Sequence, residues 1–437
     1  MQALLSYDRA PPLAAPLRFF LTAPVFGILA GVLLLWNGAD VFASRWTPAA
    51  LALTHLVTAG FMLQIMLGAM LQILPVVAGA NMAQPLHVAR FVHLATSVGA
   101  LILVAAFLSF SPLLFSLAAL LLGLGVAIFV AACARSLWGV ASTSSTISGM
   151  KLSLVGLAVT VGLGVLLSFG VGGALDLPVL QLTEIHLGWG FVAWGTTLLA
   201  AVAYVVVPMF QLTPAYPDWF GRGFAWSTLL AVTLWTFADL GGWSPVEAVL
   251  ALTVVAAPLL FSAITLLIQR RSKRARFDTT QHYWHFALCS ALAACAVWLA
   301  GRYLPSVAET QEWPLLCGVL VLFGGFMSVM IGMLYKIVPF LIWLHLQNAG
   351  QGRVMAPNMK KMICEPAMHR QLIAHLFSCA LLLLAVFWPA YFVYPAALAL
   401  IAANGGLLWN LLAAVRVYRE HLLKIDSLSA GSMQTKS

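Results

Sequence analysis

Long apolar segments dominate the chain, and charged residues are concentrated in the short stretches between them. An α-helix needs roughly 20 mostly apolar residues to cross a bilayer. Segments of this kind lie at approximately 18–36, 48–76, 89–109, 111–135, 149–173, 180–208, 223–240, 245–268, 282–301, 314–345, 370–389 and 391–415. The alternating strands of about 10 residues that are typical of membrane β-barrels do not occur. The pattern predicts an all-α polytopic membrane protein with twelve transmembrane helices.

Composition agrees with this prediction. Of the 437 residues, 62% are hydrophobic and only 8% are charged, whereas about 25% of residues are charged in a soluble domain. So few charges cannot cover the surface of a water-soluble globule. A soluble enzyme, a disordered protein and a nucleic-acid-binding protein are therefore excluded, and the lipid bilayer is the expected surrounding partner.

The distribution of basic residues predicts the orientation of the chain. Twelve spans place both termini on one side. Of the 22 Lys and Arg residues, Lys336 falls inside a span, Arg45 and Arg302 fall on the opposite side, and the remaining nineteen fall on the side of the termini. Because cytoplasmic loops are rich in Lys and Arg, we expect both termini in the cytoplasm of a bacterial-type inner membrane.

We divide the chain into three parts on this basis. Residues 1–17 form a cytoplasmic N-terminal segment, residues 18–418 the twelve-helix transmembrane domain, and residues 419–437 a cytoplasmic C-terminal tail.

A glycine and proline pattern recurs at intervals of four spans. In the second and tenth spans, a glycine lies seven residues before a proline and another glycine lies eight residues earlier: Gly60, Gly68 and Pro75, then Gly324, Gly332 and Pro339. The sixth span is similar but looser, with Gly190, Gly195 and Pro208. Small residues allow helices to approach closely. We therefore expect three pseudo-symmetric four-helix arcs, with spans two, six and ten in equivalent inner positions.

Twelve spans in three equivalent groups resemble subunit I of the heme–copper oxidase superfamily. The chain is similar in particular to the NnrS family, whose members are membrane proteins that contain heme and copper and are linked to nitric oxide stress. The similarity is carried by His55, Gly60-Phe61, Gly68, Pro75 and Gly79, and by Pro16-Leu-Arg18-Phe19-Phe20-Leu with Phe26-Gly27. At the level of motifs it covers residues 16–90. It implies non-covalent heme b, with copper as a further candidate, and nitric oxide or an electron donor as partner.

The chain also departs from this family pattern. Leu56 replaces the acidic residue that usually follows the first histidine, and neither 223–240 nor 314–344 contains the histidine pair of the oxidases. The ligands of the oxygen-reducing site are therefore missing. A functional terminal oxidase is not expected, and an enzyme of this type would be an oxidoreductase with unidentified catalytic residues.

His55 and His186 are the first candidate ligands. Each lies about seven residues, or roughly 10 Å, inside the same end of its span, and both spans are expected to be inner helices. A neutral imidazole inside a membrane needs a partner, and heme iron or another metal is a good one. The alternative is a histidine bonded to a hydroxyl or a backbone carbonyl.

A second group of histidines is expected near the cytoplasmic ends of the spans. His93, His285 and His375 begin or flank spans three, nine and eleven, and two or more of them would share one cofactor, with His285 and His375 as metal ligands. The alternative is that interfacial histidines simply accompany tryptophan and tyrosine at that depth.

Lys336 lies inside the tenth span, which makes it a functional candidate by default. Its expected partner is a heme propionate or a proton path. In the alternative, its apolar stem lets the ammonium group reach the interface.

Two functions follow from these observations. The first is an integral membrane heme-binding protein, related to redox chemistry or nitric oxide. The alternative is a twelve-helix permease for a metal, heme or small solute. Permeases typically have inverted repeats and helices broken at the bilayer midplane. Here the repeat keeps one orientation and the prolines lie near helix ends, which favours the heme-binding protein.

Overall fold

The structure, a computed structural model, describes residues 10–350 and 354–434. Within these ranges all regular elements are helices, and twelve spans are long and apolar enough to cross a membrane. This confirms the all-α polytopic fold. In chain order the spans are α1 (Ala14–Asn37) with η2 (Gly38–Phe42); α2 (Pro48–His55), η3 (Leu56–Met62) and α3 (Leu63–Ala78); α4 (Pro85–Ser109); α5 (Pro112–Leu137); α6 (Ser145–Val171); α7 (Val179–Gly188), η4 (Trp189–Thr196) and α8 (Thr197–Gln211); α9 (Asp218–Leu240); α10 (Ser244–Gln269); α11 (Thr279–Tyr303); α13 (Glu312–Val319), η5 (Leu320–Met327) and α14 (Ser328–Gly350); α15 (Glu365–Phe387); and α16 (Pro389–Gln434). The short α12 (Pro305–Ala308) and η6 (Met359–Lys361) lie between spans.

Side-chain caps fix where several spans begin. The side chains of Thr47, Ser144 and Asp278 each accept a hydrogen bond from a backbone N–H three residues later, at the first turn of α2, α6 and α11. Such caps satisfy amide groups that have no partner inside the helix. At the other end of the chain, α16 runs on to Gln434, so the described part of the expected C-terminal tail continues the last helix.

Nine outer helices form a closed ring around three inner spans. Each outer helix contacts the next in the order α1, α4, α5, α6, α9, α10, α11, α15, α16 and back to α1. The inner spans are the second, sixth and tenth, and they are 78%, 67% and 67% buried, whereas no outer span exceeds 56%. The expected arrangement, with three outer helices for each inner span, is therefore present.

Each inner span contains one π-helical segment, and each of these segments contains a Gly-Phe pair. The pairs are Gly60-Phe61 in η3, Gly190-Phe191 in η4 and Gly325-Phe326 in η5. Two hydroxyl groups donate to carbonyls five residues earlier: Thr196, the last residue of η4, donates to Phe191, and Ser328, directly after η5, donates to Phe323. A π segment at the same place in three spans is strong support for the repeat, and π segments often occur at functional sites.

Two glycines show how closely the helices approach. A Cβ atom at Gly60 would lie 2.3 Å from Cδ1 of Phe26 on α1, and a Cβ atom at Gly156 would lie 2.6 Å from the backbone oxygen of Ala193 on η4. Any larger side chain would overlap these neighbours. Small residues therefore bring the inner spans into contact with the outer ring, as the glycine pattern predicts.

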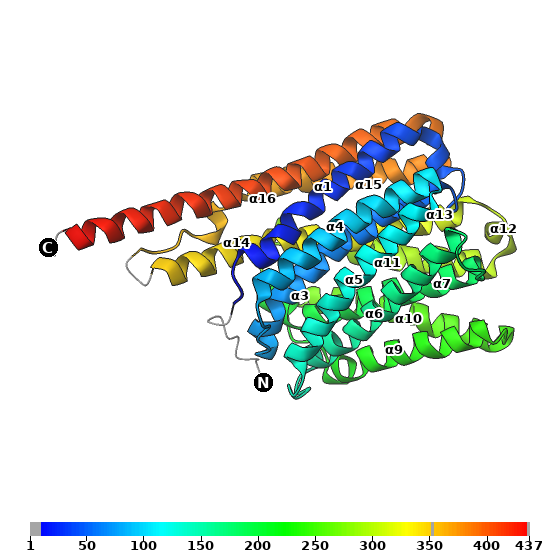
Figure 1. Cartoon of the computed structure of the whole chain (residues 1–437), viewed down its shortest axis with the longest axis horizontal. Helices are drawn as coiled ribbons and strands as arrows, with labels where there is room; N and C mark the ends of the chain where they lie inside the picture. The colour runs from blue at the N-terminus through cyan, green and yellow to red at the C-terminus, as the bar shows by residue number, and fades with distance from the viewer. Residues whose placement is uncertain (1–9, 351–353, 435–437) are drawn as a thin grey trace.

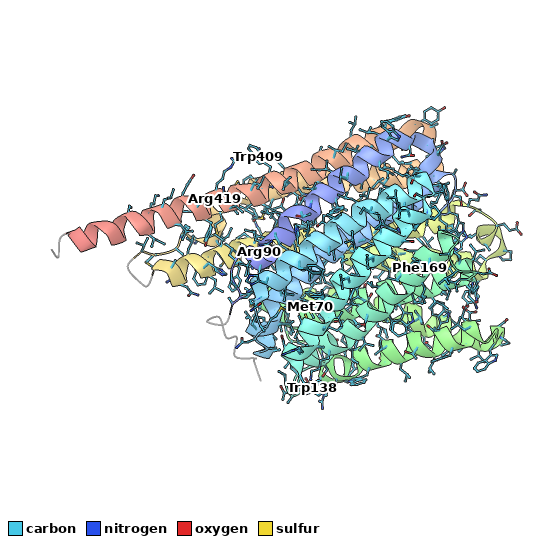
Figure 2. The ribbon with its side chains drawn as sticks, in the orientation of Figure 1. Met70, Arg90, Trp138, Phe169, Trp409 and Arg419 are labelled. Carbon is cyan, nitrogen blue, oxygen red and sulfur yellow. The ribbon has the colours of Figure 1, made fainter. Side chains whose placement is uncertain are left out.

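The spans run side by side, and their ends define two ends of the bundle (Figure 1). We call the end where α1 begins the terminal end; the last helix, α16, extends past the bundle on that side. The start of α7 and the short α12 lie at the opposite end. In Figure 2, Arg90 and Arg419 lie toward the terminal end and Phe169 toward the opposite end. That the terminal end faces the cytoplasm stays a prediction.

Candidate cofactor site between spans two and six

A cavity of about 320 Å³ lies between the second and sixth spans and is bordered by α4, α5 and α6. We call it cavity 1. Its lining begins near the opposite end of the bundle, where Trp46, Val171 and Val179 lie beside helix ends. Its lining includes Met62, fourteen residues into the second span, which corresponds to a depth of about 21 Å. Cavity 1 therefore extends from the opposite end deep into the bundle.

Both first-choice histidines line cavity 1. His55 lies seven residues after Pro48, and His186 lies seven residues after Val179, so each imidazole is about 10 Å inside its span. The expectation that these residues share one interior cavity at one depth is confirmed, while their role as ligands stays a prediction.

Backbone carbonyls hold both imidazoles in the same tautomer. Nδ1 of His55 lies 2.8 Å from the Leu51 oxygen, and Nδ1 of His186 lies 3.0 Å from the Thr160 oxygen. A carbonyl only accepts, so each Nδ1 carries the proton and donates it. Each Nε2 then has a lone pair, and neither Nε2 makes a hydrogen bond within the described residues. Metal-ligating histidines commonly have this arrangement, because the second ring nitrogen fixes the orientation of the first.

Packing also limits the position of each ring. The His55 imidazole lies against Phe107, with ring centroids 5.0 Å apart and planes tilted by 31°. The His186 ring lies over Gly164, where a Cβ atom would come within 3.3 Å of Cε1. The absence of a side chain at Gly164 thus makes room for His186.

The remaining polar groups of cavity 1 are mainly threonine hydroxyls that already donate elsewhere. Four of them donate to the carbonyl four residues earlier in their own helix: Thr54, Thr58, Thr160 and Thr183. Their oxygens can still accept a hydrogen bond or contact a cation. Cavity 1 therefore offers lone pairs in a largely apolar wall.

An ion pair lies beside the opening of cavity 1. Arg45 donates to Glu184 on α7, and its guanidinium group lies 4.5 Å from the centre of the Trp46 ring, which lines the cavity. Both charged side chains are partly exposed. This pair joins the loop before α2 to the sixth span, and it places a cation next to the opening.

Two histidines of the second predicted group have separate partners. His93 on α4 shares a hydrogen bond of 2.8 Å with the Thr22 hydroxyl on α1. His285 on α11 donates from Nδ1 to the Gln281 oxygen at 3.0 Å, and its ring stacks on Phe277 at 4.8 Å. The first contact joins two outer helices, and the second is local.

The third, His375 on α15, is fully buried. Its Nε2 atom lies 2.7 Å from the Ser328 hydroxyl, and its ring lies 5.8 Å from that of Tyr283. Among the described hydrogen bonds and ring contacts, none joins two of His93, His285 and His375. A cofactor shared by them stays a prediction that no such contact supports.

Lys336 has a partner within the chain. Its ammonium group donates to Asp278 at 2.7 Å, and the same carboxylate lies 3.1 Å from the Arg274 guanidinium. Asp278 also caps α11. Burial by itself raises the pKa of this carboxyl group, but the hydrogen bond and the charge of Lys336 outweigh burial and hold the pKa below its usual range. The lysine thus reaches the terminal end of the bundle, and a cofactor role for it stays a prediction.

The distribution of ligand types limits what the site can hold. Within the described residues, no three or more His, Cys, Asp or Glu side chains are grouped to hold a metal ion. A bare ion with a full set of protein ligands is therefore not supported. A group that brings most of its own ligands, as heme does, needs only one or two imidazoles.

The sequence did not identify every residue that shapes this site. Thr160 supplies the carbonyl that orients His186, Gly164 leaves room for its ring, and Phe191 forms part of the wall. Only Phe191 had a signal, because it belongs to the recurring Gly-Phe pair.

Comparison with known proteins does not identify a family. No model of a protein family matches the chain, and no curated protein is significantly similar to it. A function like that of the NnrS family is therefore only a proposal for this chain.

Proposed function

We propose that this integral membrane protein binds non-covalent heme b in cavity 1, with His55 and His186 as its protein ligands. One observation carries the proposal. Two imidazoles on inner helices line one cavity, each is oriented by a backbone carbonyl through Nδ1, and each keeps the Nε2 lone pair available. Metal-ligating histidines are commonly oriented in this way, by a hydrogen bond from the ring nitrogen that does not bind the metal.

The residues of cavity 1 fit such a group in three respects. The wall is largely apolar, which suits a porphyrin face. Neutral imidazoles and acceptor oxygens favour a metal centre over an anion. Arg45, next to the opening, is a cation that suits a propionate carboxylate. When bound, the heme would supply an iron centre for electron transfer or for binding a small gas.

The chain's own residues would position and shield that centre. Leu51 and Thr160 fix the two imidazoles through their carbonyls, while Phe107 and Gly164 set where each ring lies. Because the threonine hydroxyls already donate along their helices, they do not compete for the Nε2 lone pairs. The site is thus preorganised for a ligand that accepts electron pairs.

The similarity to the NnrS family extends this proposal to redox chemistry or nitric oxide, with copper as a further candidate. Oxygen reduction is not included, because the oxidase ligands are missing from 223–240 and 314–344. The basic residues near the terminal end support a bacterial-type inner membrane location with both termini in the cytoplasm.

A permease is favoured less. The three repeats keep one orientation, whereas permeases typically have inverted repeats. Pro75 and Pro208 lie near the ends of α3 and α8, as expected, whereas Pro339 lies in the middle of α14, because that helix continues to Gly350. The helix continues past each of these prolines, and the irregular segments before them are π-helical rather than unwound.

Chemical analysis of the purified protein tests the proposal. We expect about one heme b per chain by the pyridine hemochrome assay, with iron in the same amount. His55→Ala and His186→Ala should each lower the heme content at least tenfold, since each variant would remove one of the two imidazoles that would hold the group. His87→Ala is the matched control, because His87 is exposed. Colourless wild-type protein after expression with sufficient heme would contradict the proposal.

A further inference from the structure

A second cavity of about 180 Å³ lies between the sixth, eighth, ninth and tenth spans. We call it cavity 2. It is the counterpart of cavity 1 one repeat further along the chain, because each cavity lies between one inner span and the next. Cavity 1 is bordered by three outer helices, whereas cavity 2 is bordered by two, α10 and α11. Cavity 2 lies beside η4 and η5, and its lining on the sixth span, from Phe191 to Leu199, is further from the opposite end than that of cavity 1, which runs from Val179 to Trp194.

The chemistry of cavity 2 differs from that of cavity 1. Counted from the Gly-Phe pair, the place of His186 before Gly190 is taken by Val321 before Gly325, and Cys317 lies one turn earlier; both residues line cavity 2. No imidazole lines cavity 2. The thiols of Cys317 and Cys295 face the carbonyls of Ala294 and Val255 at 3.7 and 4.0 Å. Cavity 2 therefore has the shape of its counterpart without its nitrogen ligands.

The other polar side chains around cavity 2 are few. They are the hydroxyl groups of Thr196 and Ser262 and the indole of Trp298, and the Thr196 hydroxyl donates to the Phe191 oxygen at 2.8 Å. A water molecule needs two to four polar partners to stay in a cavity. An apolar cavity of about 150 Å³ stays dry and binds benzene or xenon. The size and lining of cavity 2 thus suit an uncharged apolar molecule.

Phe191 connects the two cavities. Among the described residues it is the one that lines both cavities, and it lies inside η4. Its ring stacks on Phe326 of η5, with centroids 5.9 Å apart. A residue that borders two cavities is the wall between them, so removal of its side chain should join them.

The rim of cavity 2 is partly exposed on the outer helices. Val255 and Pro258 on α10 and Ala291 on α11 are half-buried, and these helices belong to the ring that faces lipid. Apolar molecules concentrate in the bilayer, so this side gives them a route into the protein.

We propose that cavity 2 is a binding site for a small uncharged apolar molecule of the size of xenon or a diatomic gas, and that Phe191 is the partition between this site and cavity 1. Molecules that dissolve in the bilayer would enter cavity 2 and reach the histidines by movement of the Phe191 ring. The site does not depend on heme.

Crystals of the full chain under xenon pressure test the binding site. We expect an anomalous xenon peak in cavity 2, next to Phe326. Ala291→Phe should fill the cavity and lower the xenon occupancy at least fivefold. Ala293→Phe is the matched control, because Ala293 lies on the same helix and is exposed, and it should keep the peak. An empty cavity 2 in the wild-type protein, or one filled by a lipid or detergent chain, would overturn the assignment.

Phe191→Ala tests the partition. We expect a new xenon peak where the ring lay, between the two cavities. Phe191→Leu is the second variant if the alanine variant does not fold, and it should show the same peak at lower occupancy. Peaks that remain confined to the wild-type positions in both variants would overturn the role of Phe191. Because xenon reports on the cavities alone, failure here is distinct from failure of heme binding.

Discussion

The His186 ring lies directly over Gly164, so that a Cβ atom at residue 164 would come within 3.3 Å of the imidazole Cε1. The methyl group of an alanine at this position would fit tightly against the ring, and the larger side chain of valine would displace the ring from the Thr160 carbonyl that orients it. We expect Gly164→Val to weaken heme retention by about 10–100-fold, the usual effect of losing a hydrogen bond that orients a metal-ligating histidine. Titration of the apoprotein with hemin measures this. Unchanged affinity in the valine variant would mean that His186 is not a ligand.

Close contact between α6 and η4 makes Gly156 sensitive to substitution. Its Cβ atom would lie 2.6 Å from the Ala193 oxygen, which belongs to the backbone and cannot rotate away. We expect Gly156→Ala to destabilise the protein by about 3 kcal/mol, the upper part of the range for overpacking.

Gly162, six residues further along α6, is the control for this prediction. Apart from the backbone of its own helix, no described atom lies within 4 Å of its Cβ position, so Gly162→Ala should be neutral or stabilise the helix by up to about 1 kcal/mol. Thermal unfolding in detergent compares the two. Equal melting temperatures would contradict the contact.

The Asp278–Lys336 ion pair should make stability depend on pH. The pKa of Asp278 in the folded protein is lowered, with the charge and hydrogen bond of Lys336 outweighing burial. The pair therefore stabilises the fold fully above the pKa of an unfolded aspartate, about 4. This contribution is lost as pH falls through the lower pKa of the folded state.

Asp278→Asn tests this dependence. We expect a loss of about 2 kcal/mol at pH 7, since the variant removes a partly buried ion pair. The difference from wild type should shrink as the pH falls below about 4. Asp218→Asn is the control, because its pair with Arg222 is exposed and worth little. If the difference in stability between the variant and the wild-type protein stays constant down to pH 3, the charge of Asp278 does not stabilise the folded protein.

The Arg45–Glu184 pair should matter more for heme than for stability. Both side chains are partly exposed, so we expect a coupling of only about 0.2–1 kcal/mol in a double-mutant cycle by thermal unfolding. Arg45→Gln should nevertheless lower heme retention more than Glu184→Gln, because Arg45 is the cation beside the opening of cavity 1. Equal heme loss in the two variants would argue against a propionate contact.

Much of the fold could be predicted, because hydropathy determines where the spans lie and small residues determine which spans pack closely. The twelve apolar segments match the spans, and the glycine and proline spacing around Gly60 and Gly324 identified the inner helices. The common depth of His55 and His186 followed from counting residues along two inner spans. These predictions depend on distances along one helix, which the sequence contains directly.

Features that depend on contacts between distant segments could not be predicted. Asp278 is the partner of Lys336 only because α11 packs on α14, and Phe191 is a wall only because cavities lie on both sides of η4. The π segments could not be predicted either. A π-helical turn holds about one residue more than an α-helical turn, and this difference does not change the hydropathy of the segment. In retrospect the Gly-Phe pair marked all three.

The most direct test is to replace each candidate ligand by glycine and to supply free imidazole. His55→Gly and His186→Gly leave a hole of the size of the missing ring in cavity 1. We predict that each variant loses the heme absorption spectrum of the wild-type protein and that added imidazole restores it, which a merely structural role would not allow. Retention of the wild-type spectrum in both variants without imidazole would contradict the proposed ligation.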